Sequence, residues 1–169
     1  FVLIFIIKLV FYTNNNNTQE DLIICKSMNT IVMKFGGTSV ASIEKLKNIA
    51  DIVSKEVQKN KIVVVLSAMA GETNKLQGYL NHFVSQNSIE SDLVLTSGEQ
   101  VTVGLLSAAL KSKGIKSIPL LGWQIPIITN DNYENAKILH IDNIRIQKYF
   151  ENNEVIVLPG FQGINIHGK

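Results

Sequence analysis

Lys34-Phe35-Gly36-Gly37-Thr38-Ser39-Val40 follows a short apolar run and precedes a segment with the periodicity of an amphipathic helix. The pattern predicts a strand, a glycine-rich turn and a helix in that order. Glycines let the backbone approach a ligand closely because no Cβ stands in the way. N–H groups at the start of a helix, the positive charge of Lys34 and the hydroxyl of Thr38 would together favour an anionic group, most simply a phosphate.

An ordinary strand-to-helix turn would contain Gly36-Gly37 equally well, since Gly-Gly pairs are common in turns. The stretch is not a P-loop, because the chain contains no G-x-x-x-x-G-K-[ST] pattern. The phosphate-binding interpretation therefore depends on Lys34, which stands at the strand end two residues before the glycines, and on the hydroxyls that follow them.

The first 27 residues are expected to lie outside the folded domain. The block 1–12 is apolar except for Lys8, and it is too short for a bilayer span, which needs about 20 residues. It also lacks the basic leader and the small-residue cleavage site of a signal peptide. We expect the domain to begin at Met28; a membrane-associated leader is the alternative.

Residues 28–169 are enough for one domain with a hydrophobic core. The net charge is +2 and no basic cluster is interleaved with aromatics, so a nucleic-acid partner is not expected. Cys25 is the only cysteine, which argues against disulfides and cysteine-bound metal and suits a reducing cytosol. The histidines at 82, 140 and 167 have no metal-ligand spacing, so we interpret them as structural and expect no metal site.

Strands and helices alternate along the domain. Expected strands are 31–33, 62–66, 115–121, 125–129 with Pro126 at its edge, 138–141 and 155–158; expected helices are 43–57, 74–84, 92–112 and 144–151, with a polar loop at 130–135. The continuous β-branched run 62–66 is typical of a strand buried on both faces of a parallel sheet. The order predicts an α/β sandwich with a mostly parallel open sheet.

Three predicted strand ends carry glycine or hydroxyl residues, namely Gly36-Gly37, 67–71 and 160–163. Ligands of open α/β sheets bind at the carboxyl ends of the strands, so the three ends should converge on a ligand site with phosphate character. Thr73 follows the second of these ends. Its position alone favours a helix N-cap over a ligand contact.

The helix expected at 92–112 is apolar nearly all round, which predicts that it is buried. Glu99 is an unusual residue in such a helix unless it is paired or near an opening. It could lie in the first turn after Gly98 and favour the helix dipole. It could equally face the cleft and receive a cationic group of a ligand, and the spacing does not decide between the two.

Taken together, these motifs resemble the aspartokinases of the amino-acid kinase superfamily. The matching segments, in order, are 34–40, 65–71 with Thr73-Asn74, 97–99, 128–131 with 136–138, and 158–163. They cover essentially all of 28–169, and Glu72 departs from them where the family often has an aliphatic residue. The resemblance implies the N-terminal half of the amino-acid kinase fold, a three-layer α/β/α sandwich.

The resemblance also implies an activity: transfer of the ATP γ-phosphate to the β-carboxylate of L-aspartate, the first step towards lysine, threonine and methionine. Mg²⁺ would arrive with the nucleotide, and no catalytic base is needed because the acceptor carboxylate is ionised at neutral pH. By motif, the implied site residues are Lys34 as catalytic group, Lys34, Gly36, Gly37 and Thr38 for the ATP phosphates, and Ser67, Thr73 and Glu99 for aspartate, with Glu99 meeting its α-ammonium.

In the family, a further segment and the half that binds adenine and ribose follow the region matched by 28–169. We therefore expect this chain to be inactive, or nearly so, alone. It would be a truncated gene product, a fragment, or one half of a split enzyme with a separately encoded C-terminal half; a non-catalytic remnant is the alternative. Other amino-acid kinases would share the glycine turn, but not Ser97-Gly98-Glu99 or Thr73-Asn74. The resemblance implies a cytoplasmic enzyme that forms homo-oligomers when full length.

Overall fold

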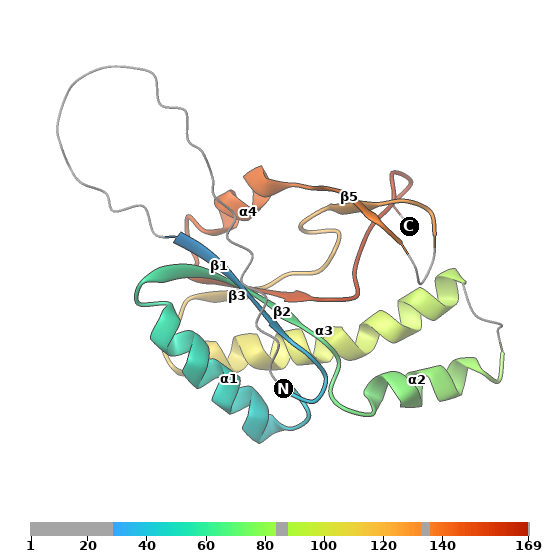
Figure 1. The fold of residues 1–169 in the computed structure, drawn as a ribbon, viewed down its shortest axis with the longest axis horizontal. Helices are drawn as coiled ribbons and strands as arrows, with labels where there is room; N and C mark the ends of the chain where they lie inside the picture. The colour runs from blue at the N-terminus through green and yellow to red at the C-terminus, as the bar shows by residue number, and fades with distance from the viewer. Residues whose placement is uncertain (1–28, 84–87, 133–135, 169) are drawn as a thin grey trace, which may run out of the picture.

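A four-stranded parallel sheet in the order β1-β2-β6-β3 forms the middle layer of the computed structural model (Figure 1). The structure describes residues 29–83, 88–132 and 136–168, so the predicted leader at 1–27 lies outside the described residues. The strands of this sheet are β1 (Asn29–Phe35), β2 (Asn60–Leu66), β6 (Val155–Pro159) and β3 (Ser117–Pro119).

The central strands carry the continuous apolar runs. β1 pairs with β2 in register from Asn29 opposite Asn60 to Phe35 opposite Leu66, and β6 lies on the other side of β2. The predicted run 62–66 is therefore a central strand, and its side chains contribute to the hydrophobic clusters on both faces of the sheet. This alternation is what a strand covered on both sides requires.

One face of the sheet is covered by the helices α1 (Ile43–Glu56) and α3 (Ile89–Ser112), and α2 (Glu72–Leu80) packs against α3, as Figure 1 shows. The larger core lies under α1 and α3. It comprises Met33, Phe35, Val40, Leu46, Ile49, Ala50, Val53, Val57, Ile62, Val64, Leu66, Val103, Leu106, Leu110, Ile115, Val155 and Val157.

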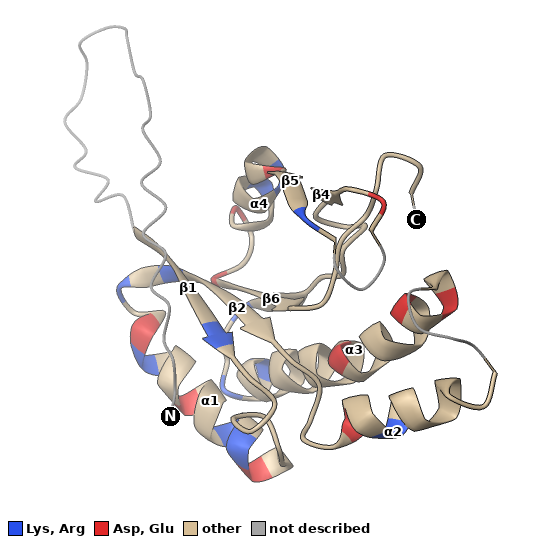
Figure 2. Cartoon of the chain, turned by 45° about the vertical axis from the view of Figure 1, so that its right-hand side comes forward, with Lys and Arg blue, Asp and Glu red and all other residues tan. Residues whose placement is uncertain are grey.

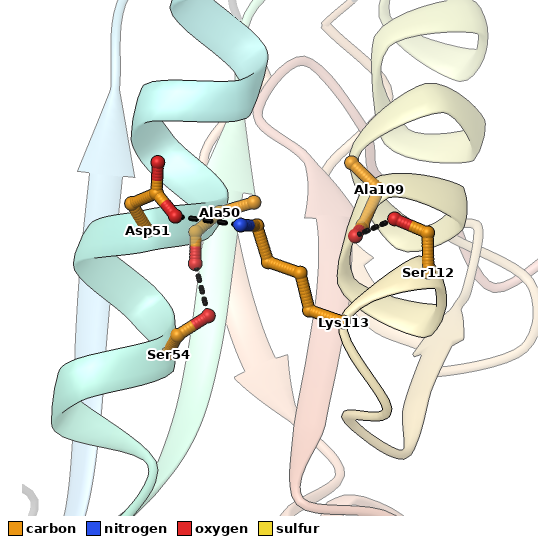
Figure 3. A network of polar contacts seen from close by, with 6 residues as sticks. All are labelled: Ala50, Asp51, Ser54, Ala109, Ser112 and Lys113. Carbon is orange, nitrogen blue, oxygen red and sulfur yellow. Dashed lines mark hydrogen bonds and ion pairs between the residues drawn. The ribbon is translucent and has the colours of Figure 1, made fainter.

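A polar contact at the surface joins α1 to the end of α3 (Figure 3). Lys113 Nζ lies 2.6 Å from Asp51 Oδ1, and its hydrogen bond and charge hold the pKa of Asp51 below its ordinary value. Nearby hydroxyls are satisfied within their own helices, since Ser54 donates to Ala50 O and Ser112 to Ala109 O. The pair is exposed, so it contributes little to the stability of the fold.

The opposite face is covered by α4 (Asn143–Tyr149) and by the chain before β4. Its core comprises Val63, Leu120, Ile125, Phe150, Ile156 and Leu158. Helices therefore flank both faces of a parallel sheet, which confirms the predicted α/β sandwich. Figure 2 shows that most charged residues lie on the helices and loops around this sheet.

Two strands form a small antiparallel sheet of their own, β4 (Ile127–Thr129) with β5 (Ile138–Ile141). Ile164 joins β4 on the other side through a parallel bridge to Ile128. Both strands had been predicted from their apolar character, but they do not extend the main sheet. The hairpin lies above the carboxyl ends of the parallel strands (Figure 1).

The predicted start of α3 was wrong. The helix begins at Ile89, where the Ser88 hydroxyl accepts from the N–H of Ser91, and not at Asp92. Glu99 therefore lies in the helix interior, which removes the first-turn dipole interpretation. The helix is also not buried all round, because the side chains of Leu93 and Val101 are 71% and 58% exposed.

The expected N-cap role of Thr73 was also wrong. Gly71 occupies the cap position of α2 with φ of 86°, a backbone conformation that glycine adopts without penalty. Thr73 lies inside the first turn and its side chain is exposed. By length and composition α3 could cross a membrane, yet it packs on the sheet through Val103, Leu106 and Leu110, as a core helix does.

Candidate functional site

The glycine turn leaves the carboxyl end of β1. The Gly36 carbonyl accepts hydrogen bonds from Ser39 N–H at 2.8 Å and Val40 N–H at 3.2 Å, which closes the turn on itself. Residues 38–42 separate the glycines from α1, where the Ser42 hydroxyl accepts a hydrogen bond from the N–H of Lys45. The prediction that the turn opens the helix directly was therefore wrong, and the helix terminus does not supply the N–H groups at Gly36.

The second strand end lies against the first. Ser67 N–H donates to Phe35 O at 3.2 Å, so the loop after β2 starts beside the end of β1. A Cβ at Gly37 would lie 3.3 Å from the carbonyl oxygen of Ala68, whereas one at Gly36 would meet nothing within 4 Å. The turn is thus packed on the neighbouring loop at Gly37 and open at Gly36.

Ala68 also contacts α3. A Cβ at Gly98 would lie 3.1 Å from Ala68 Cβ and 3.2 Å from Leu76 Cδ1 of α2. Ala68 therefore lies between Gly37 on one side and Gly98 on the other, and the side chain of the next helical residue, Glu99, starts beside this contact. Small residues at 37 and 98 bring the glycine turn and α3 close together.

The loop after β6 reaches the same edge of the sheet as the loops after β1 and β2. Gly160 N–H donates to Leu66 O at 2.8 Å, and a Cβ at Gly160 would lie 3.3 Å from that oxygen and 3.8 Å from Glu99 Oε1. The loops after β1, β2 and β6 therefore meet at one edge of the sheet, as the sequence predicted. The carboxylate of Glu99 lies where they meet.

Glu99 is the buried acidic residue of the site, with 8% of its surface exposed. Its Oε2 accepts a hydrogen bond from Phe161 N–H at 2.6 Å. Burial raises its pKa, while the backbone N–H groups of Phe161 and Gly160 and the charge of Lys34 oppose that rise. Lys34 therefore lies close enough to Glu99 for the two charges to interact, although its own side chain is exposed.

The predicted site also includes three hydroxyl residues, Thr38, Ser67 and Thr73. Thr38 is exposed, and its carbonyl accepts a hydrogen bond from Lys45 Nζ at 2.7 Å. Ser67 is half-buried between the first two loops. Thr73 lies in the first turn of α2, and in the described part of the chain no residue bonds to its hydroxyl. The structure brings together Lys34, Gly36, Gly37, Ser67 and Glu99, and leaves Thr38 and Thr73 at the margin.

A cleft of about 650 Å³ adjoins this site on the other side of Phe161. Its walls are the first half of α3, the segments 121–123 and 129–132, and the segment 159–165. None of the site residues predicted from the sequence lines it. On α3 the lining includes Asp92, Thr96 and Gln100, which recur every four residues and form a polar stripe that the sequence could have revealed.

The wall formed by 159–165 is held in place by contacts with β4. Thr129 N–H donates to Ile164 O at 3.0 Å, and Asn165 Nδ2 donates to Asp131 Oδ1 at 2.6 Å. A Cβ at Gly163 would overlap the side chain of Thr129. Both polar atoms of the Gln162 side chain are buried without a hydrogen-bond partner in the described residues, which carries a free-energy cost.

Comparison with known proteins agrees with this geometry. Residues 29–169 match the model of the amino acid kinase family. The aspartokinase of Rickettsia felis is 45% identical over 143 residues, which are 82% of this chain and 36% of the relative. The aspartokinase of Geobacillus stearothermophilus is 42% identical over 144 residues, 84% of this chain and 35% of the relative.

The fold of the chain is also similar to solved structures of aspartate kinases. Aspartate kinase from Synechocystis superposes with a TM-score of 0.69 at 33% identity, over 82% of this chain and 23% of that chain. The fold is also that of E. coli aspartokinase III in complex with aspartate and ADP, with a TM-score of 0.66 at 21% identity over 82% and 42% of the two chains. The chain spans about a third of the length of the curated relatives it matches. Its sequence and its fold place it in the amino acid kinase family.

Proposed function

We propose that this chain forms the substrate-binding half of an aspartate kinase, which transfers the γ-phosphate of ATP to the β-carboxylate of L-aspartate. One observation carries the proposal: the loops after β1, β2 and β6 meet at one edge of the sheet, and the buried carboxylate of Glu99 lies there beside the open glycine turn that follows Lys34. The identity to proteins named aspartokinase supports this substrate over those of other amino acid kinases.

Phosphoryl transfer to a carboxylate asks the protein mainly for positioning and charge neutralisation. Lys34 supplies a positive charge, and the open side of Gly36 leaves room for a phosphate against the backbone. Gly37 keeps the turn close to the next loop, and Thr38 adds a hydroxyl at its rim. The acceptor carboxylate is already ionised at neutral pH, so its proton needs no base.

Glu99 would bind the α-ammonium group of aspartate. Its Oε2 is engaged by Phe161 N–H, but a carboxylate accepts several hydrogen bonds, so its oxygens can also receive a cation. A buried carboxylate gains more from such a cation than an exposed one. Ser67 and Thr73 would contribute hydroxyls to the same substrate from the loop after β2 and from the start of α2.

ATP would bind as its magnesium complex. Among the residues that the structure describes, no three His, Cys, Asp or Glu side chains are grouped as metal ligands. The Mg²⁺ would be held mainly by the nucleotide phosphates, as is usual in kinases, where it neutralises the phosphate charge. Lys34 and the glycine turn would hold those phosphates in place.

The remaining parts of the enzyme are proposed from its relatives. Because this chain spans about a third of their length, we propose that a further segment, in the same chain or separately encoded, supplies the rest of the nucleotide site. We further propose a cytoplasmic homo-oligomer with no nucleic-acid partner. A non-catalytic remnant remains the alternative that the following experiment separates.

Aspartyl hydroxamate formation tests the proposal. The 169-residue chain is assayed with ATP, Mg²⁺ and L-aspartate, alone and mixed with the part of Rickettsia felis aspartokinase that lies beyond the matched region. We expect turnover only in the mixture, and none when L-glutamate or UMP replaces L-aspartate. A mixture that binds the added segment but gives no product supports a remnant, and preference for another acceptor overturns the aspartate assignment.

A further inference from the structure

The cleft beside the Glu99 site has the size of a small-molecule site. Its volume of about 650 Å³ falls within the usual range of about 300–1,000 Å³ for such sites. Its walls are the first half of α3 and the segments 121–123, 129–132 and 159–165. Lys34, Gly36 and Glu99 do not line it, so the contacts proposed for aspartate and for the ATP phosphates do not involve this space.

The charged side chains that line the described part of the cleft are acidic. Asp92 lies half-buried on the α3 wall, and Asp131 lies on the wall formed by 129–132. Asp131 Oδ1 accepts a hydrogen bond from Asn165 Nδ2 at 2.6 Å, which holds this carboxylate against the segment 159–165. Lysine, arginine and histidine are absent from the described lining residues, and Lys137 only stands between two of them in the sequence. A lining with two carboxylates and no basic side chain attracts cationic ligands and repels anionic ones.

Apolar side chains on three walls of the cleft are exposed. Leu93 of α3 is 71% exposed, Trp123 of the segment 121–123 is 61% exposed, and Ile138 of β5 is 60% exposed. A ligand with an apolar body would remove part of this surface from water, which favours binding. The face of the Trp123 indole ring also attracts cations. The cleft therefore combines the apolar surface and the negative charge that suit an organic cation.

The segment 159–165 also brings to the cleft a polar side chain that lacks a partner. Gln162 lines the cleft, and Nε2 and Oε1 of its amide are buried with no hydrogen-bond partner among the described residues. Such groups are rare in folded proteins because burial removes their hydrogen bonds to water. An ammonium group carries three N–H donors, so it can bond to an amide oxygen and to a carboxylate together. A cationic ligand would thus supply the partner that Gln162 Oε1 lacks.

We propose that this cleft binds a small organic cation, with an ammonium group on an apolar body, at a site separate from those of ATP and aspartate. The ammonium group pairs with Asp92 and Asp131 and donates to Gln162, while the apolar body packs on Trp123 and Leu93. Phosphates and free carboxylates are excluded by charge. The proposal depends on the cleft alone and is independent of the phosphoryl-transfer activity.

The fluorescence of Trp123, the only tryptophan of the chain, reports binding directly. The 169-residue chain is titrated with phenethylammonium, with phenethyl alcohol as the uncharged analogue of similar shape and phenylacetate as the anionic one. We expect a saturable change with phenethylammonium and no binding of phenylacetate. The alcohol should bind at least about tenfold more weakly, because it lacks the charge. Equal affinities for the ammonium ligand and the alcohol overturn the proposal, as does the absence of a saturable change.

Neutral variants of the two acids test where the charge binds. Asp92→Asn and Asp131→Asn should each weaken phenethylammonium binding at least about fivefold, since the amide keeps the size of the side chain and removes its charge. Glu151→Gln is the matched control, because Glu151 is exposed and does not line the cleft. Urea unfolding checks that each variant is folded. Wild-type affinity in both aspartate variants overturns the proposal. Loss of binding in Glu99→Gln alone also overturns it, because the cation would then bind at the aspartate site.

Gln162→Leu tests the amide separately from the charges. Leucine is similar in size and removes both atoms that lack partners, so the free energy of unfolding should stay the same or rise. The affinity for phenethylammonium should fall several-fold, because one hydrogen bond to the ligand is lost. A stable variant with wild-type affinity would contradict the contact between Gln162 and the ligand.

Discussion

Glu99, in the interior of α3, accepts a 2.6 Å hydrogen bond from the backbone N–H of Phe161, which follows the last strand of the sheet. The contact ties the helix to the loop that separates the glycine turn from the neighbouring cleft. One carboxylate thus has two tasks, holding a loop in place and presenting negative charge where three strands end. Variants can separate these tasks.

Glu99→Gln should preserve the loop and remove the charge. Burial raises the pKa of Glu99 above 4.5, so its stability contribution is fully present below pH 4.5 and is lost as the pH rises through the folded-state pKa. The variant should therefore be as stable as the wild type or more stable at pH 8, and lose that advantage towards pH 4. Urea unfolding across this range measures the effect, with the exposed Glu151→Gln as control. A variant that is clearly less stable at pH 8 would contradict the assignment.

Lys34→Ala should reduce catalysis more than substrate binding. In the complemented enzyme we expect kcat to fall by about 10²–10³, the range for losing one charged group that acts on the transition state. The KM for aspartate should change little. Lys47→Ala, another exposed lysine near the start of α1, is the matched control. An unchanged kcat would remove Lys34 from phosphate binding.

Gly36→Ala should impair nucleotide binding without loss of stability, whereas Gly163→Ala should reduce the stability of the fold. A Cβ at Gly36 meets no atom within 4 Å, so the variant should fold normally while its methyl group occupies the space proposed for a phosphate. A Cβ at Gly163 would overlap Thr129, and we expect a loss of about 1–3 kcal/mol in unfolding free energy from overpacking. Thermal melting and nucleotide binding of both variants check this. A destabilised Gly36→Ala variant with normal binding would reverse the interpretation.

Lys45→Met should weaken nucleotide binding without affecting aspartate. The Lys45 ammonium donates to Thr38 O at 2.7 Å and so fastens the far side of the glycine turn. Methionine keeps most of the side-chain length and removes the donor. We expect the KM for ATP to rise several-fold and the KM for aspartate to stay constant, with Lys55→Met as a control on the same helix. Equal increases in both values would indicate a general loss of structure.

The sequence predicted most of the sheet because its signals were local. A continuous β-branched run such as 62–66 can hardly be anything but a central strand, and the glycines at 36–37 and 160 mark strand ends. The convergence of these ends followed from the parallel order alone. The parallel order did not decide the place of Glu99, and only the resemblance to the aspartokinases put it in the same predicted site as Lys34.

The sequence-based predictions were wrong where a helix cap or a tertiary contact determines the local structure. Ser88 caps α3, so the helix begins at Ile89 and not at Asp92, where the apolar pattern predicted its start. Glu99 therefore lies in the helix interior. Gly71 takes the left-handed cap position that Thr73 was expected to fill. The adjoining cleft depends on how the segment 159–165 lies against β4, and no local pattern encodes that contact.

Ala68 separates the glycine turn from α3, with Gly37 on one side and Gly98 on the other. The backbone of Ala68 lies against the turn and its methyl group lies against the helix, so this one small residue limits how closely the two approach. A bulkier side chain at position 68 would push α3 away from the loop after β2. Glu99, the next residue after Gly98, would then move away from the glycine turn.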